Sequence, residues 1–352
     1  MSTQSATTDT DTDIETESQI FGTVKSLRHS PTALAGGLII LGLVILAVFA
    51  TIDVWVFDRM LITSLYQDPQ ATNTANAYAQ PSVTHPLGTD RFGRDILARI
   101  IYGTRIALAI GIVAVGISFF GGIVVGAAAA YFGGYVDDVL MRLAEVLYSI
   151  PALILALTFM AIFGNSIYNL FFAFGVIGIP GYARVMRSEV FSIREEQYID
   201  AAKTSGLSNA KILFREVIPN GLAAVLVQAT LSMGGVIIGA AALSFLGFGV
   251  SPPTASWGRM LSDARQALLI APWVAAAPGA MIFLTVMGFN MLGDGLRDAM
   301  DPKVNLSQDD FDDDDVLETD SGTVTTDWDD VGLAGEATVE HSDTDGSAGG
   351  SD

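Results

Sequence analysis

The chain has 352 residues, of which 51% are hydrophobic and only 16% are charged, and this composition excludes an ordinary soluble domain. It contains no cysteine, which excludes disulfides, thiolate catalysis and cysteine-bound metals. Its three histidines, His29, His85 and His341, are far apart in the sequence, so we expect neither a metal site nor a metal cofactor.

The formal net charge of −20 resides in two tails rather than in the body of the chain. Residues 1–24 hold five acids, residues 307–352 hold sixteen, and neither segment has a Lys or Arg. The segment between them therefore contains the other 17 of the 38 acids and all 18 basic residues, and it is nearly neutral. Tails rich in Asp, Ser, Thr and Gly bury too little apolar surface to offset chain entropy, so both are predicted to be disordered. Such acidic tails favour a solvating role, as in the salt-rich cytoplasm of a halophile, and we expect no nucleic-acid partner.

The body, residues 25–306, is predicted to be a transmembrane domain of six helices in lipid. A span needs about 20 largely apolar residues, and uncharged stretches of this length recur along the body. One stretch, 146–183, is long enough for two short spans with a turn at Gly164 to Ser166. The first 24 residues lack the features of a cleavable signal peptide, so the first span is expected to remain as an anchor. The predicted spans are 32–52, 106–131, 146–163, 167–184, 221–247 and 274–293.

An even number of spans puts both termini on the same side of the membrane. If this side is the cytoplasm, eleven of the 18 Lys and Arg lie inside and seven lie outside. The positive-inside rule therefore favours cytoplasmic termini in a multi-pass protein of the cell membrane. Between the first two spans, this topology leaves an outer segment over residues 53–105.

Within the spans, glycine pairs have the spacing at which helices approach each other closely, and we expect tight packing at Gly122 with Gly126 and at Gly235 with Gly239. No span centre carries a charge, which argues against a proton relay or an ion-coupled carrier. The uncharged polar residues inside spans are Gln228, Thr230 and Asn290. We expect these to form interhelical hydrogen bonds.

The loop from Arg187 to Asn220, between the fourth and fifth spans, is cytoplasmic in this topology. Ser192 and Glu195 have the spacing of a capping box, so a helix is predicted to begin there. Gly206 suits the left-handed conformation that follows a helix, so this helix is predicted to end there.

A second helix of the loop is predicted to begin at Ser208, whose hydroxyl can cap it, and to last until Pro219 forces a break. The loop would then be a short helix-turn-helix that projects from the bundle. From the residues alone, an ordinary amphipathic loop on the membrane surface is the alternative.

The loop also carries a motif, in which Asp200, Ala201 and Ala202 are followed at fixed spacing by Gly206 and then by Pro219. This spacing resembles the EAA loop of the permease subunits of ATP-binding-cassette importers, where the loop is the coupling helix docked on the ATPase subunit. The resemblance implies that these five residues form an ATPase-coupling loop. The family's leading glutamate is Asp200 here, which keeps the charge on a shorter side chain.

Two further blocks resemble the C-type permease of dipeptide, oligopeptide and nickel importers. One is HPLGTDRFGRDILARIIYGTRIAL, from His85 to Leu108, and the other starts with SFLGFGVSPPTASWGRML at Ser244 and continues to Pro302. The stretch GTDRFGRD has Arg94 and Asp95 where a phosphate-binding loop needs Lys and a hydroxyl, so we expect no nucleotide here. No catalytic set stands out, so an enzyme is not expected.

The resemblance implies the fold of the type I importer permeases and four kinds of partner. These are a second, homologous permease subunit, two ATP-binding-cassette ATPase subunits, an extracellular substrate-binding protein and membrane lipid. Peptides are the first expectation for the substrate, and nickel or another small solute is the alternative within the same class. A secondary carrier or a channel is the alternative from another class. The residues of the substrate pathway are not predicted.

Overall fold

The structure is a computed structural model that describes residues 30–65 and 68–300, and every regular element in these ranges is a helix. The two tails predicted to be disordered lie outside the described residues. Five helical runs are long and apolar enough to cross a bilayer: α2 (Pro31–Trp55), α4 (Ile96–Phe132), α7 (Ile167–Arg194), α9 to α10 (Asn209–Phe245) and α12 (Trp273–Met300). The all-helical membrane class is therefore confirmed.

Helix α4 begins ten residues before the predicted span at 106–131. The cause is Asp95, whose carboxylate accepts a hydrogen bond from the Ala98 N–H at 2.8 Å and so caps the helix in front of two arginines. Those arginines, Arg99 and Arg105, had marked the limit of the apolar stretch, but they lie inside the helix.

The predicted third span at 146–163 is wrong as a single straight helix. The chain forms α5 (Gly134–Ser149) and α6 (Ala152–Phe163), which meet at an angle of 88°. Pro151 has no N–H to donate, and Ile150 before it is extended. Helix α5 therefore ends at Ser149, and α6 begins after Pro151. The count reaches six spans if this bent pair crosses the membrane as one. The predicted turn at Gly164 to Ser166 is present, because α6 ends at Phe163 and α7 begins at Ile167.

The most extensive contact between two helices joins α4 to α7, and small residues allow their backbones to approach closely there. A Cβ at Gly122 would lie 2.2 Å from the Cβ of Tyr182, and one at Gly126 would lie 2.3 Å from the carbonyl oxygen of Ala183. The expected tight packing is therefore present at this pair. At the other predicted pair it is present only at Gly239, since Gly235 faces open space.

For two of the three polar residues expected to bond between helices, Gln228 and Thr230, the hydrogen bonds are local. Gln228 donates to Ser232, and the Thr230 hydroxyl donates to the Leu226 carbonyl, so both bonds stay within α10. Hydroxyl groups in helices often bond to the carbonyl one turn back, and this local bond satisfies Thr230. One interhelical hydrogen bond comes from the Ser118 hydroxyl on α4, which donates to the Gly175 carbonyl of α7 at 2.7 Å.

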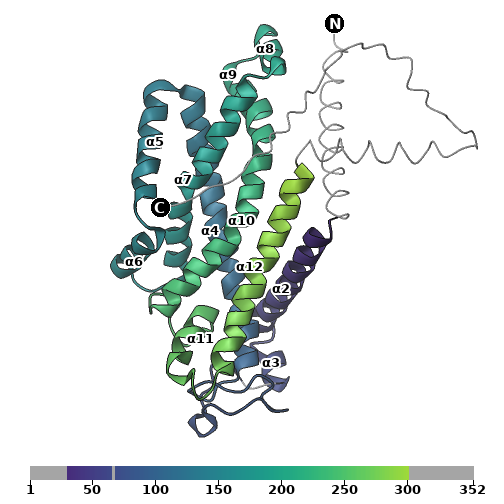
Figure 1. Cartoon of the computed structure of the whole chain (residues 1–352), viewed down its shortest axis with the longest axis vertical. Coiled ribbons are helices and arrows are strands. Elements are labelled where there is room, and N and C mark those ends of the chain that lie inside the picture. The colour runs from purple at the N-terminus through teal and green to yellow at the C-terminus, as the bar shows by residue number, and fades with distance from the viewer. Residues whose placement is uncertain (1–29, 66–67, 301–352) are drawn as a thin grey trace, which may run out of the picture. The chain divides into compact units, whose positions relative to one another are not determined.

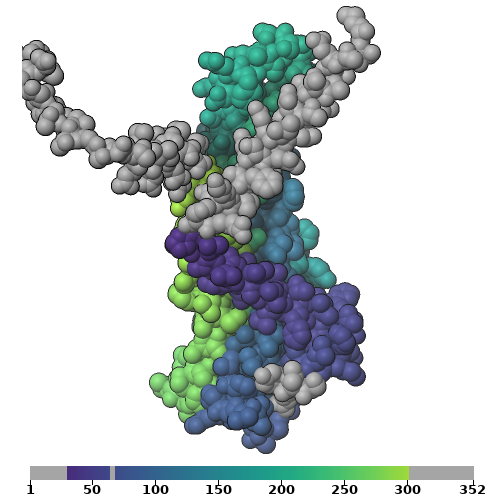
Figure 2. Space-filling view, turned by 90° about the vertical axis from the view of Figure 1, so that its right-hand side faces the viewer, coloured from purple at the N-terminus to yellow at the C-terminus, as the bar shows by residue number. Residues whose placement is uncertain are grey.

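The helices place two sets of short elements at opposite ends of the bundle (Figure 1). One end carries α8 (Gln197–Thr204) and α9 (Asn209–Ile212), and the first residues of α2 and the last of α12 are nearer to this end. Figure 2 shows α2 with α12 beside it, and a Cβ at Gly295 would lie 2.3 Å from the Cβ of Ala33.

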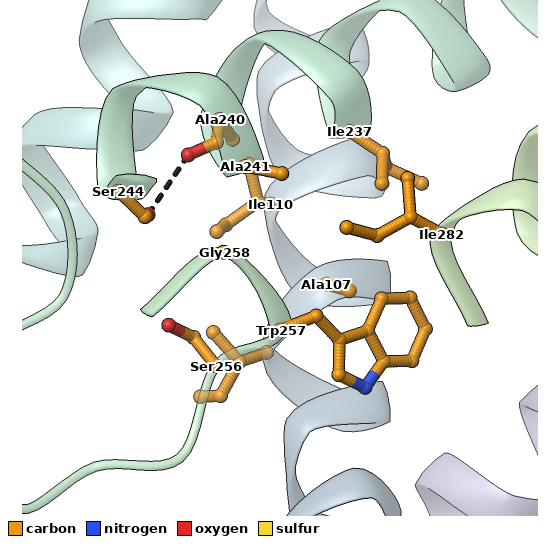
Figure 3. A pocket seen from close by; sticks show the side chains of 11 residues that line it. Ala107, Ile110, Ile237, Ala240, Ala241, Ser244, Ser256, Trp257, Gly258 and Ile282 are labelled. Carbon is orange, nitrogen blue, oxygen red and sulfur yellow. Dashed lines mark hydrogen bonds between the residues drawn. The ribbon is translucent and has the colours of Figure 1, made fainter. Parts of the chain in front are cut away.

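The opposite end of the bundle is closed by the segment between α2 and α4 and by the segment before α12. The short elements at this end are α3 (Met60–Leu65), η1 (Thr74–Asn76), α11 (Trp257–Ala264) and η3 (Arg265–Ala267). Helix α11 packs against α4 and α10, where the Trp257 indole donates to the Ile100 carbonyl at 3.2 Å. A small apolar cavity remains between these three helices and α12, lined by Trp257, Ile110 and Ile237 among others (Figure 3).

Candidate functional site

The predicted coupling loop, residues 187–220, begins inside α7 rather than after it. Helix α7 continues to Arg194, so Ser192 lies within this helix and does not cap a new one. The predicted capping box is therefore wrong, and α8 instead starts at Gln197 after Glu196, whose side chain makes no capping hydrogen bond. The apolar face of the last turns of α7 packs onto the loop and extends the helix past the position of the sequence signal, since Val190 is fully buried there.

The end of α8 forms as predicted. Gly206 has φ +80°, and the N–H groups of Gly206 and Leu207 donate to the carbonyls of Lys203 and Ala202. This pattern is a Schellman motif, which requires a left-handed residue at its centre. Ser208 then caps α9 as predicted, with its hydroxyl accepting from the Lys211 N–H at 3.4 Å. The resulting helix-turn-helix has a sharply defined turn.

Helix α8 has one face on the protein and one face in the open. Ile199 is only 1% exposed and Ala202 is partly buried, and both pack into the cluster that also contains Ile212 and Val217. Asp200 and Ala201 are exposed, and so is Gly206 in the turn. We call the exposed Asp200, Ala201, Thr204, Ser205 and Gly206 the outer face of α8. Ala202 therefore belongs to the support of the helix, while Asp200, Ala201 and Gly206 remain accessible to a partner.

Polar contacts on the outer face stay within the loop. Asp200 and Lys203 form an exposed ion pair at 2.9 Å, which contributes little to stability in water. The Ser205 hydroxyl donates to the Ala201 carbonyl at 2.9 Å. Since the surface ion pair is weak, Asp200 is available for a stronger contact to another chain.

Pro219 does not break the chain's helix as predicted. A π-helical turn, η2 (Leu213–Val217), connects α9 directly to α10 (Ile218–Phe245), and the run Asn209–Phe245 forms one long helix. The wider π turn lets the chain pass Pro219, which has no N–H to donate, without a break. Pro219 therefore lies in the first turn of α10, where proline is tolerated.

Three polar contacts that the sequence did not reveal hold the loop to the bundle. The Arg194 guanidinium donates to the Ala130 carbonyl near the end of α4 at 2.8 Å. The Asn220 amide donates to the Tyr198 hydroxyl at 3.2 Å, and burial raises the pKa of this hydroxyl. These contacts hold the end of α7 against α4, and α8 against α10.

The third contact lies about two helical turns before Arg194 and joins α7 to α5. Arg187 donates two hydrogen bonds to the Asp137 carboxylate, at 2.6 and 2.5 Å. Its partner lies 50 residues away, so no local pattern marks the pair. The three contacts together connect the loop to α4, α5 and α10.

A second concentration of charge lies at the opposite end of the bundle, in the GTDRFGRD stretch and α11. Asp90 accepts hydrogen bonds from the Phe92 and Arg94 N–H groups, at 2.8 and 3.0 Å, so the loop's amides bind its own carboxylate rather than a phosphate. Arg94 also donates to Asp263 of α11 at 3.2 Å. We call this group the arginine cluster, and its members are Asp90, Arg91, Arg94, Arg99, Arg259 and Asp263.

Comparison with known proteins agrees with the all-helical membrane fold. Residues 122–306 match the family described as the inner membrane component of binding-protein-dependent transport systems. The chain is 42% identical over 280 residues to the dipeptide transport system permease protein DppC of Alkalihalophilus pseudofirmus, which covers 80% of this chain and 88% of the relative. It is 38% identical over 280 residues to the glutathione transport system permease protein GsiD of Escherichia coli, covering 80% and 89%.

The matched regions include the coupling loop and α10 to α12, which are the elements that organise both ends of the bundle. The relatives are named for transport and not for catalysis, in agreement with the expectation that this chain is a transport subunit. The chain belongs to the family of inner-membrane permease subunits of ATP-binding-cassette importers that depend on a binding protein.

Proposed function

We propose that this chain is the permease subunit of a peptide importer and that α8 is the element through which ATPase subunits drive it. As a member of its family, the chain is a multi-pass inner-membrane protein that works in a complex with ATPase and other subunits. Its relatives are named for dipeptide and glutathione transport, which supports short peptides as the substrate class. The complex is proposed to contain a second, homologous permease, two ATPases and an extracellular binding protein.

The observation that carries the coupling role is the division of α8 into two faces. Its inner face, through Ile199 and Ala202, is packed on the ends of the membrane helices. Its outer face presents Asp200, Ala201 and Gly206 to solvent. A helix that is packed on the membrane helices on one side and exposed on the other can move with a docked partner as a rigid unit and displace those membrane helices. Pro219 is proposed to set the angle at which this push enters α10.

The mechanism follows from these contacts. When ATP closes the two ATPases, the docked α8 moves with them and carries α7 and α10, through Val190 and Val217 in the shared apolar cluster. Arg194 and Arg187 extend the same movement to α4 and α5. The membrane helices thereby change their relative positions and open the pathway to the opposite side.

This role requires α8 and both termini to be cytoplasmic, the orientation that the positive-inside count favours. Ser30 and Met300, the first and last described residues, belong to the helix ends nearer to α8. The domain limits 25–306, with a solvating tail of residues 1–24 before and 307–352 after, are proposed on the same basis of charge and composition.

The docking role is tested with Gly206→Glu in the full complex. A Cβ at Gly206 meets no atom within 4 Å in this chain, so the new side chain points into open space, where the partner is proposed to dock. We expect normal membrane insertion, loss of the co-purified ATPase and loss of ATP-dependent uptake of a labelled dipeptide. Unchanged uptake would exclude the docking assignment.

Backbone strain is separated from docking by a second pair of variants. Gly206→Asn keeps a residue that tolerates the left-handed conformation, and Ala201→Glu places a charge on the outer face without any strain. We expect Ala201→Glu to release the ATPase and the control Ala210→Glu, on α9, to retain it. Competition of dipeptide uptake by glutathione and by Ni²⁺ tests the substrate class, since competition by Ni²⁺ alone would contradict a peptide importer.

A further inference from the structure

The arginine cluster holds more positive charge than its own chain neutralises. Four arginines, Arg91, Arg94, Arg99 and Arg259, share two carboxylates, those of Asp90 and Asp263, which leaves an excess of two positive charges. Among the described residues, the neighbouring Asp95 forms no ion pair with these arginines, and its carboxylate lies 2.9 Å from the His85 ring and caps the N-terminus of α4. Within the described residues, the cluster is therefore incomplete.

The two halves of the cluster differ in exposure. The side chains of Arg94 and Arg99 are 7% and 1% exposed, so they are part of the interior. The side chains of Arg91 and Arg259 are 33% and 27% exposed, and these two arginines reach solvent. The buried pair fixes the fold of this end, and the exposed pair is free to meet another molecule.

The exposed arginines converge on one atom. The Arg91 guanidinium lies 3.1 Å from Oδ1 of Asp263, and Nε of Arg259 lies 3.5 Å from the same oxygen. Among the described residues, neither Nε finds a hydrogen-bond acceptor although both are buried. Arg91 is also held over the Phe92 ring, with its Cζ 4.4 Å from the ring centre. Two guanidinium groups are thus held side by side at one carboxylate oxygen, and both side chains are partly exposed.

We propose that Arg91 and Arg259 bind a carboxylate of the extracellular binding protein when this protein docks on the permease. This inference rests on the proposed function, since the cluster faces the outside only if α8 is cytoplasmic. A planar guanidinium matches a carboxylate in two parallel hydrogen bonds, and charged groups at the edge of an interface mainly set the rate and register of docking. Asp263 keeps the two arginines close together in the absence of the partner.

The test uses the assembled transporter in nanodiscs of zwitterionic lipid together with the binding protein that co-purifies with it. We expect Arg91→Gln and Arg259→Gln each to weaken the binding of this protein about fivefold, the effect of one favourable surface ion pair. Raising the salt concentration is expected to weaken the wild-type complex more than the double variant, because salt screens the contact that the variant lacks. Arg59→Gln, which removes an arginine at the same end but outside the cluster, is expected to bind normally.

Lysine variants separate charge from packing. Arg91→Lys and Arg259→Lys are expected to recover part of the affinity, because lysine keeps the charge but cannot form two parallel hydrogen bonds, and co-purification of the ATPase verifies that every variant is assembled. Unchanged affinity in the double glutamine variant would overturn the proposal, and so would an equal loss in the lysine variants. Greater retention of phosphatidylglycerol by the wild type, without any difference in protein affinity, would identify a lipid phosphate as the ligand instead.

The experiment also distinguishes this inference from the proposed function. If the wild-type complex binds no external protein at any salt concentration, the importer assignment fails and the inference fails with it. If the wild type binds and the glutamine variants bind equally well, only the carboxylate contact is wrong.

Discussion

Arg94 and Asp263 lie 169 positions apart in the sequence, and their side chains meet at 3.2 Å with both largely buried. Asp263 is also the acid that Arg91 and Arg259 approach. Replacing it by Ala therefore leaves three arginines without their shared carboxylate.

We expect Asp263→Ala to destabilise the protein by about 3–5 kcal/mol, the usual cost of removing one partner of a buried ion pair. The measurement is the midpoint of thermal unfolding in detergent, followed by fluorescence-detected gel filtration. Asp294→Asn, an exposed acid on α12, is the control and is expected to leave the midpoint unchanged. An equal midpoint for Asp263→Ala would show that the cluster does not hold the two segments together.

Gly126→Ala tests the contact between α4 and α7. Its Cβ would lie 2.3 Å from a backbone oxygen, which cannot move without shifting α7, so we expect a loss of about 1–3 kcal/mol or more. Gly116→Ala on the same helix meets no atom within 4 Å and is expected to be neutral. The same thermal assay compares the two variants, and equal stability would contradict close packing at this contact.

The pair of Arg187 and Asp137 is tested with a double-mutant cycle built from Arg187→Gln and Asp137→Asn. Its two short hydrogen bonds and partial burial predict a coupling of about 1–2 kcal/mol. The exposed pair of Arg142 and Glu145, at 3.5 Å, provides the matched cycle and is expected to give about 0.5 kcal/mol or less. Equal couplings for the two pairs would mean that α5 and α7 are not braced at Asp137.

Ile199→Ala tests the support of α8 rather than its outer face. The side chain is 1% exposed, and removing it is expected to cost about 2–5 kcal/mol of local stability. We expect faster hydrogen exchange of the α8 amides and less peptide imported per ATP hydrolysed, with the ATPase still bound. Lys211→Ala, an exposed change on α9, is the control. Unaltered exchange in Ile199→Ala would remove Ile199 from the support.

Deleting residues 307–352 is expected to leave peptide uptake unchanged at matched salt concentration. The basis is compositional, because the segment holds sixteen acids and no Lys or Arg and is predicted to act by solvation alone. The measurement is uptake by the truncated complex at low and high salt. Failure of the truncated chain to assemble with its partners would assign the tail a binding role.

Apolar length and flanking charge were sufficient to predict the helical membrane class, because both are properties of consecutive residues. The turn of the coupling loop was also predictable, since Gly206 and Ser208 act on their immediate neighbours. The predicted capping box at Ser192 was wrong because packing of the buried Val190 extends α7 to Arg194, past the position where the capping pattern predicted a new helix. The prediction of a break at Pro219 was also wrong, because a π turn accommodates the proline within a long helix.

The remaining features depend on residues that are distant in the sequence. Arg187 finds Asp137 across 50 positions, and Arg94 finds Asp263 across 169. A single sequence does not indicate such pairs, because each residue by itself resembles an ordinary solvated charge. The bend at Pro151 was overlooked because the stretch around it is uncharged, and a lack of charge does not reveal where a helix changes direction.

The bend between α5 and α6 has a consequence for the biogenesis of the protein. The twelve residues of α6 rise about 18 Å, which is short of a hydrocarbon layer of about 30 Å. A backbone corner within the hydrocarbon layer is stable only where protein or water covers it, since lipid offers no hydrogen bonds. If the bent pair crosses the bilayer as one span, its corner must be covered by protein or water, and membrane proteases are expected to remove copies in which an absent partner leaves it facing lipid.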